Sequence, residues 1–287
     1  MLIGLNYIGT RNELLGCIED VGNVQEVLQG TLGYSPENIT LLTEVSVTRP
    51  TRANIVAALT ALISATRPGD VAFVWYSGHG KQISNPLAPM GFSNAWISLD
   101  AIILETELQD IFSLAPAGAK VFVGSDCCHS GTLLDLKYIF GELSLVHRVK
   151  AAVPPPGSYQ SESTVTQGHL RKSFDALKSP SDTSAEKGHS HVLVSDSNFS
   201  ITSADIVCLS GCRDEQTGSD TYVDSESQGA MTWSFLKTLR TYGKTVALAE
   251  MLANMRLLLE INSFDQVPQL SMGRAADAKL LTLDQFV

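Results

Sequence analysis

Two short apolar runs, each leading directly into a glycine-containing turn, constrain the fold of this chain most strongly. Residues 70–76 (Asp-Val-Ala-Phe-Val-Trp-Tyr) run into Ser-Gly-His-Gly at 77–80, and residues 121–123 (Val-Phe-Val) run into Gly-Ser-Asp-Cys-Cys-His-Ser-Gly at 124–131. Unbroken apolar runs bounded by small and polar residues are typical of strands buried on both faces of a parallel sheet. Open α/β sheets build their sites at the carboxyl ends of such strands. The sequence therefore predicts an α/β protein with a site where these two strands end.

The residues at the two strand ends suggest a thiol and its base. A catalytic cysteine needs a base or imidazolium partner to raise its thiolate fraction, and His79 could face a cysteine on a neighbouring strand. Side chains on adjacent extended residues point opposite ways, so Cys127 and Cys128 cannot both face His79. Two structural interpretations stay open at this point: the cysteines could fill a tight turn as small hydrophobes, and His79 could cap a glycine turn. The sequence identifies no third member of a catalytic triad.

The rest of the chain alternates between strand and helix patterns, which predicts a three-layer α/β fold. Residues 81–92 are rich in Asn, Pro and Gly and are expected to form a loop. The apolar face of the last helix is expected to be core rather than a groove for a partner. The expected strands cover residues 2–7, 39–43 and 205–210 besides the two above, and the expected helices cover 12–30, 51–66, 231–242 and 246–259.

The chain of 287 residues is expected to form one structural domain. Residues 151–199 open with three consecutive prolines and are rich in Ser, Thr, Gly and His with little apolar periodicity. This composition predicts a flexible linker. The linker would join a larger region, 1–150, which carries His79 and the cysteine pair, to a smaller region, 200–287.

Net charge, apolar runs and cysteine usage indicate which partners and which cell compartment to expect. A net charge of −10 argues against nucleic acid as the main partner. No apolar run is long enough to span a bilayer, and the first residues enter a strand without the pattern of a signal peptide. Five cysteines without a framework spacing favour reduced thiols and a cytoplasmic or nuclear location.

The motifs, taken together and in order, resemble those of the metacaspases, in the caspase-like clan of cysteine peptidases. They are spread over nearly the whole chain, and the match is to a type I catalytic domain without its N-terminal prodomain. The resemblance implies a mostly parallel sheet of six strands flanked by helices, in a protein that is a monomer. The matching segments are residues 15–20, 76–80, 126–131, 134–138, 210–217 and 229–232.

The resemblance also implies roles for individual residues. Cys128 would be the nucleophile and His79 its acid–base partner, with the backbone N–H groups of Gly78 and Cys128 binding the oxyanion. We therefore expect polypeptide substrates. Arg and Lys residues in and just before the expected linker make self-cleavage a hypothesis, whose alternative is that these charges are simply solvated.

An acidic pocket for the substrate's P1 side chain is implied at Asp20 and Asp126, together with Ser77. Two carboxylates in a small pocket would bind Arg or Lys through charge-assisted hydrogen bonds and would repel Asp. Each carboxylate has a structural alternative. Asp20 would ordinarily be a solvated helix residue, and Asp126 could cap the turn.

Calcium dependence is a separate question. Metacaspases usually carry an acidic stretch between the two catalytic strands, but residues 82–94 contain no carboxylate. Glu105, Glu107 and Asp135, with waters, could supply oxygen ligands for a calcium ion; alternatively, the glutamates favour a helix N-terminus. We predict that no cofactor is required and leave calcium binding open.

Two other functions remain as alternatives to a peptidase specific for basic residues. One is a pseudoprotease or scaffold that binds basic peptides without cutting them. The other is a relative in the same clan with a different P1 preference.

Overall fold

The computed structural model describes residues 1–86, 91–127, 134, 136–140, 192–194, 203–211, 220–223, 226–274 and 281–287, with only the backbone at 192–194, 220–223, 226 and 227. Cys128 and Asp135 lie outside the described residues, as does most of the expected linker. No helix in the described part of the chain has the length and apolar character needed to cross a membrane.

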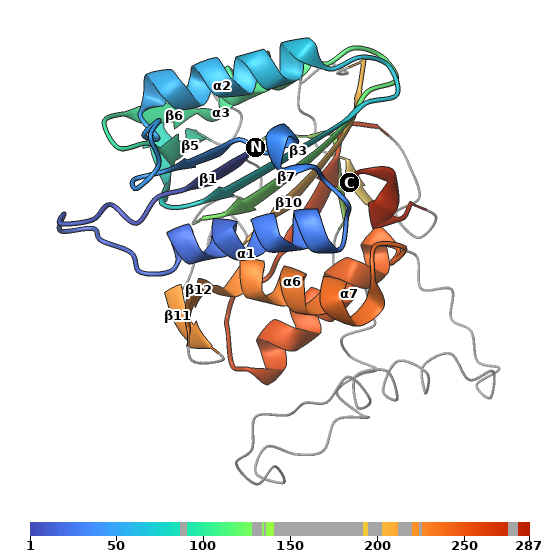
Figure 1. Cartoon of the computed structure of the whole chain (residues 1–287). Helices are drawn as coiled ribbons and strands as arrows, with labels where there is room; N and C mark the ends of the chain where they lie inside the picture. The colour runs from blue at the N-terminus through green and yellow to red at the C-terminus, as the bar shows by residue number, and fades with distance from the viewer. Residues whose placement is uncertain are drawn as a thin grey trace, which may run out of the picture.

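A central sheet organises the fold (Figure 1). In its described part it has eight strands in the order β2-β1-β3-β7-β10-β13-β8-β9. Its first five strands run parallel, and the last three pair antiparallel. The strands are β1 (Leu2–Gly4), β2 (Leu41–Thr43), β3 (Val71–Ser77), β7 (Lys120–Asp126), β8 (Tyr138–Phe140), β9 (Val192–Val194), β10 (Asp205–Ser210) and β13 (Gln269–Met272).

Helices cover both faces of the sheet (Figure 1). One face carries α2 (Arg52–Ala65) and α3 (Glu105–Ser113), and the other carries α1 (Cys17–Gly30), α6 (Ala230–Tyr242) and α7 (Leu248–Ile261). Strand β3 shows how alternation divides the core. Val74 and Tyr76 pack with α2 and α3, whereas Phe73 and Trp75 pack with α1, α6 and α7, because successive side chains of a strand face opposite sides. The predicted three-layer α/β fold is confirmed.

Three expectations about individual elements need correction. In the described part of the chain, the sheet has eight strands instead of six, because β8 and β9 continue it beyond β13. The expected loop at 81–92 is partly strand: β4 (Gly80–Ser84) pairs with β5 (Phe92–Ile97), and β5 pairs with β6 (Ile102–Leu104). The first helix begins at Cys17 rather than near Asn12, so residues 5–16 form a long connection beside the carboxyl edge of the sheet.

The C-terminal elements agree with the pattern in the sequence. Strand β10 has the expected bounds, and the apolar face of α7 is core: Leu248, Met251, Leu252 and Met255 are fully buried. A second small sheet is formed by β11 (Asp220–Val223) and β12 (Glu226–Gly229). Strand β12 leads directly into α6, which places the start of that helix against the carboxyl ends of β3 and β7.

Candidate active site

His79 lies at the carboxyl edge of the sheet, two residues after β3 ends. Strands β3 and β7 are parallel neighbours in which Ser77 is paired with Asp126, and the Gly78 N–H continues the ladder by donating to the Asp126 carbonyl at 3.2 Å. The two strands that carry the predicted dyad therefore end side by side, as expected from the sequence. Because the Gly78 N–H already makes this hydrogen bond, it is not free to donate to an oxyanion.

Cys127 is the last described residue before the predicted nucleophile. Its side chain is buried in the core on the α2 and α3 face, and its Sγ lies 3.3 Å from Ser125 Oγ. Cys127 thus occupies the inward position that strand alternation left for one of the two cysteines. The role of Cys128 stays a prediction, because Cys128 lies outside the described residues.

The imidazole of His79 has a backbone partner that no sequence pattern identified. Its Nε2 lies 2.7 Å from the carbonyl oxygen of Asn12, in the connection between β1 and α1. A carbonyl oxygen only accepts, so Nε2 carries the hydrogen, and Nδ1 is the basic nitrogen of the neutral ring. His79 therefore has the tautomer that leaves Nδ1 available to exchange a proton with a thiol.

The connection that supplies this carbonyl is held in place by its own hydrogen bonds. The Glu44 carboxylate accepts from the N–H groups of Asn6, at 2.5 Å, and Ile8, at 2.8 Å. Asn6 in turn accepts from Leu14 N–H at 2.7 Å and, through Oδ1, from Ile18 N–H at 3.1 Å. These bonds tie the connection to β2 and to the first turn of α1.

The structure brings the two predicted pocket carboxylates together beneath the strand ends. Asp20, in the first turn of α1, is fully buried, and Asp126 is 7% exposed. Ser77 Oγ donates to Asp20 at 2.6 Å, and the Gly229 N–H donates to both Asp20 oxygens at 2.9 and 3.1 Å. Thr232 donates to Asp126 through its N–H at 2.8 Å and its hydroxyl at 2.7 Å.

The Gly229 and Thr232 donors lie at the start of α6. Gly229 is the N-cap of α6 and Thr232 is in its first turn, so both carboxylates face the N-terminal end of this helix, where the helix dipole favours negative charge. These described donors are neutral groups. The result is a pair of buried carboxylates at the carboxyl edge of the sheet.

Gly229 is required by the close approach of both carboxylates. A Cβ at this position would lie 2.2 Å from Asp126 Oδ2 and 2.7 Å from Asp20 Oδ2. Gly229→Ala is therefore expected to lower the free energy of unfolding by roughly 1–3 kcal/mol through overpacking. Urea unfolding would measure the loss.

Gly22→Ala is the matched control for that substitution. Gly22 lies inside α1, and a Cβ there meets nothing within 4 Å, so this change is expected to leave stability unchanged or to raise it by up to about 1 kcal/mol. Equal effects of the two substitutions would contradict the packing read from the structure.

Two of the predicted calcium ligands, Glu105 and Glu107, contact other groups of this chain. Glu105 accepts from Asn94 N–H at 2.9 Å, and Glu107 forms a 2.6 Å ion pair with Arg52 of α2. Within the described ranges, no three His, Cys, Asp or Glu side chains form a group that could hold a metal ion. Asp135 lies outside them, and a calcium site stays a prediction.

Comparisons with known proteins agree with this geometry. Residues 1–278 match the caspase domain family. The chain belongs to the caspase-domain family of cysteine peptidases. Metacaspase-1 of Meyerozyma guilliermondii is 29% identical over 298 residues, which cover 98% of this chain and 70% of the relative. Metacaspase-1 of Candida albicans is 32% identical over 299 residues, which cover 98% and 66%. A crystal structure of a protein from Geobacter sulfurreducens has the same fold, with a TM-score of 0.62, 22% identity and coverage of 99% and 96%.

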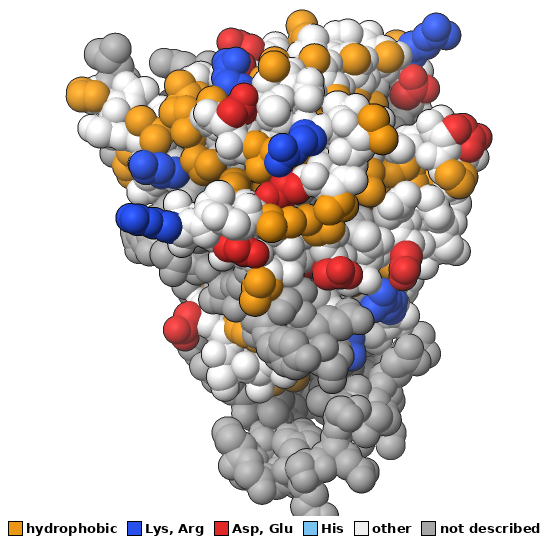
Figure 2. Space-filling model, turned by 60° about the vertical axis from the view of Figure 1, so that its left-hand side comes forward, with side chains coloured by type: hydrophobic (Ala, Val, Ile, Leu, Met, Phe, Trp, Pro, Cys, Tyr) orange, Lys and Arg blue, Asp and Glu red, His pale blue; other side chains and the backbone are white. Residues whose placement is uncertain are grey.

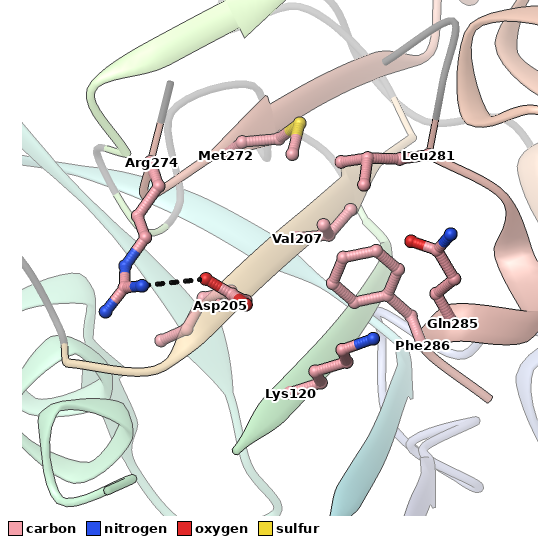
Figure 3. Close-up of a pocket in the computed structure, with 9 residues that line it drawn as sticks. Lys120, Asp205, Val207, Met272, Arg274, Leu281, Gln285 and Phe286 are labelled. Carbon is pink, nitrogen blue, oxygen red and sulfur yellow. Dashed lines mark ion pairs between the residues drawn. The ribbon is translucent and has the colours of Figure 1, made fainter. Parts of the chain in front are cut away.

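A pocket of about 310 Å³ lies at the opposite edge of this caspase domain, away from His79. Figure 3 shows Lys120 and Asp205, the first residues of β7 and β10, with Asp205 paired to Arg274 at 3.3 Å. Val207, Met272, Leu281 and Phe286 supply apolar walls. Because the candidate active site is at the carboxyl ends of the strands, this pocket is not part of it.

Several residues of the caspase-domain site escaped sequence reasoning. Asn12 contributes only its carbonyl, and Gly229 only its N–H and its small size, so neither carries a recognisable side-chain signature. Thr232 lies within a segment that resembled the metacaspases but had no assigned role. For Thr232 the usable signal was its place in the first turn after Ser-Gln-Gly-Ala at 227–230, a sequence that can begin a helix.

Proposed function

We propose that this caspase domain is a cysteine endopeptidase that cleaves polypeptides after Arg or Lys. The observation that carries the proposal is the pairing of β3 with β7, which sets His79 beside a strand leading to Cys128 and above the buried pair Asp20 and Asp126. The Cys128 thiolate would attack the carbonyl carbon of the basic residue, and the bond from this carbon to the next residue's nitrogen would break. The His79 imidazolium would protonate the leaving amine, and the neutral ring would then activate water for deacylation.

The buried acidic pair supports a preference for a basic P1 residue. A guanidinium or ammonium brings a positive charge to carboxylates whose described donors are neutral, and charge-assisted hydrogen bonds are stronger than neutral ones. A P1 Asp would add a third negative charge to a poorly solvated pocket. Electrostatics thus favours Arg and Lys over Asp.

Exposed apolar side chains on the same edge support a polypeptide substrate. Ile8 and Leu15, in the connection after β1, are 55% and 65% exposed, and Val45 and Val47, after β2, are more so. Figure 2 turns this side of the molecule forward and shows hydrophobic side chains gathered among separate charged ones. Apolar surface beside a reactive centre suits contact with peptide side chains.

A panel of fluorogenic peptides with P1 Arg, Lys or Asp, assayed with EDTA and with calcium, tests the proposal. We expect turnover of the Arg and Lys peptides, none of the Asp peptide, and loss of turnover in Cys128→Ala. Equal rates with EDTA and with calcium would show that no calcium site is needed. Turnover of the Asp peptide alone would indicate a different P1 preference, and binding without turnover would indicate a scaffold.

Self-processing is tested on the same two protein samples. Wild-type protein that cuts itself at the basic residues of 148–187 yields fragments, whereas Cys128→Ala retains its intact mass. Identical intact masses would refute self-cleavage without affecting the proposed action on other polypeptides.

A further inference from the structure

Two buried phenol hydroxyls hold the peptide group of His79. We propose that Tyr7 and Tyr76 act as a clamp that positions the His79 imidazole for proton transfer, an inference that rests on the proposed function. Tyr7 follows β1 and Tyr76 is the penultimate residue of β3, so the clamp joins two neighbouring strands at the edge where the site lies.

The hydrogen bonds of the clamp reach both ends of the His79 residue. Its N–H donates to Tyr7 Oη at 2.9 Å, and its carbonyl accepts from Tyr76 Oη at 2.7 Å. The two hydroxyls lie 3.2 Å apart. The clamp also contacts a third strand, β5, because Tyr7 Oη donates to the Ile97 carbonyl at 2.7 Å.

The hydrogens can be assigned without conflict. Each phenol has one proton to donate: the shortest contacts direct that of Tyr7 to the Ile97 carbonyl and that of Tyr76 to the His79 carbonyl. Tyr7 Oη is then the acceptor for the His79 N–H. Burial raises the pKa of both Tyr7 and Tyr76 above the usual value, so both hydroxyls keep their protons throughout the neutral range.

Gly78 fits between the two hydroxyls because it lacks a side chain. A Cβ at this position would lie 2.8 Å from Tyr76 Oη and 2.9 Å from Tyr7 Oη. The glycine before His79 is thus explained by the clamp.

The two tyrosines are themselves held in place. Tyr7 has a left-handed backbone, with φ of +53°, a conformation that a bulky residue adopts only where its surroundings impose it. Tyr76 stacks on Trp96 with ring centroids 4.4 Å apart and planes at 6°. Trp96 Nε1 donates to Ser125 Oγ on β7 at 2.9 Å, so the support extends to the strand that leads to Cys128.

The clamp fixes where Nδ1 of His79 points. The residue is held at its N–H and its carbonyl by the tyrosines and at Nε2 by the Asn12 carbonyl, while the Tyr7 ring lies against the imidazole with centroids 4.7 Å apart. Nδ1 is the ring atom that remains for proton exchange. The hydrogen bonds described for the two hydroxyls are with each other and with backbone groups of His79 and Ile97, so we assign them a positioning role.

Removing one hydroxyl at a time tests the clamp. Tyr7→Phe and Tyr76→Phe are each expected to lower kcat roughly 10- to 100-fold while KM changes little, because small misplacements of catalytic groups are costly. The alkylation rate of Cys128 at pH 6, which depends on a thiolate paired with imidazolium, is expected to fall in both variants. Tyr34→Phe is the matched control, because Tyr34 is a half-buried tyrosine that packs on the α1 side of the sheet, and it is expected to retain both properties.

A readout that does not depend on turnover separates this inference from the proposed function. The ¹⁵N and ¹³C signals of the His79 ring report its tautomer and its hydrogen bonds, and the clamp predicts that both Tyr→Phe variants shift these signals while Tyr34→Phe does not. Unshifted signals with wild-type kcat in both variants would overturn the clamp. Shifted signals in a protein without peptidase activity would support the clamp and refute the proposed function.

Discussion

Replacing His79 by alanine is expected to lower kcat for cleavage after Arg roughly 10²- to 10⁴-fold, the range contributed by general acid–base catalysis. His79 follows the strand paired with β7, and its Nε2 hydrogen bond to the Asn12 carbonyl leaves Nδ1 as the proton-exchanging atom. In the proposed mechanism, removal of the imidazole would deprive the Cys128 thiol of its base and the leaving amine of its proton donor. Initial rates over a series of P1 Arg peptide concentrations would separate kcat from KM.

KM is expected to change little in His79→Ala, because the imidazole is not part of the proposed P1 pocket. His169→Ala, in the expected linker, serves as the control for loss of a histidine. Retention of wild-type kcat by His79→Ala would exclude this residue from the chemistry, whatever the state of Cys128.

Replacing Asp126 by asparagine is expected to reduce kcat/KM for P1 Arg peptides by roughly 10- to 100-fold, because a hydrogen bond to a charged partner contributes about 1.5–3 kcal/mol. Asparagine retains the volume and one oxygen that can accept from Thr232 N–H and Oγ1. The change therefore removes the charge with little disturbance of packing. The measurement is the ratio of kcat/KM for P1 Arg to that for P1 citrulline, which has the shape of Arg without its charge.

Glu19→Gln is the matched control for Asp126→Asn. Glu19 precedes Asp20 in α1 but is exposed, so its neutralisation changes the net charge equally without touching the buried pair. Its ratio of Arg to citrulline cleavage is expected to equal that of the wild type. An unchanged ratio in Asp126→Asn would mean that this carboxylate does not select the P1 residue.

The sequence was informative where a pattern is local. The apolar runs that became β3 and β7 are buried on both faces, so their hydrophobicity is continuous, and the turns after them contain the residues with chemistry. Strand β10 and helix α6 were found for similar reasons. Strands β8 and β9 have three residues each, too few for a periodic signal, and their pairing depends on segments far apart in the chain.

The site itself was predictable only in part. Asp20 resembles any acidic residue in the first turn of a helix, and the resemblance to metacaspases, rather than its own sequence context, indicated a place in a pocket. Its burial depends on Ser77 and Gly229, which are 57 and 209 residues away. The Asn12 carbonyl could not be predicted at all, because every residue has one and only the folded connection decides which of them meets His79.

The distance in sequence between Asp20 and the Gly229 N–H also orders events during synthesis. Asp20 and Asp126, like His79 and Cys128, leave the ribosome well before Gly229 and Thr232 do. Until then, the two carboxylates lack the helix end that holds them together. If the proposed function holds, the nascent chain therefore acquires its selectivity for basic residues only in the final third of translation.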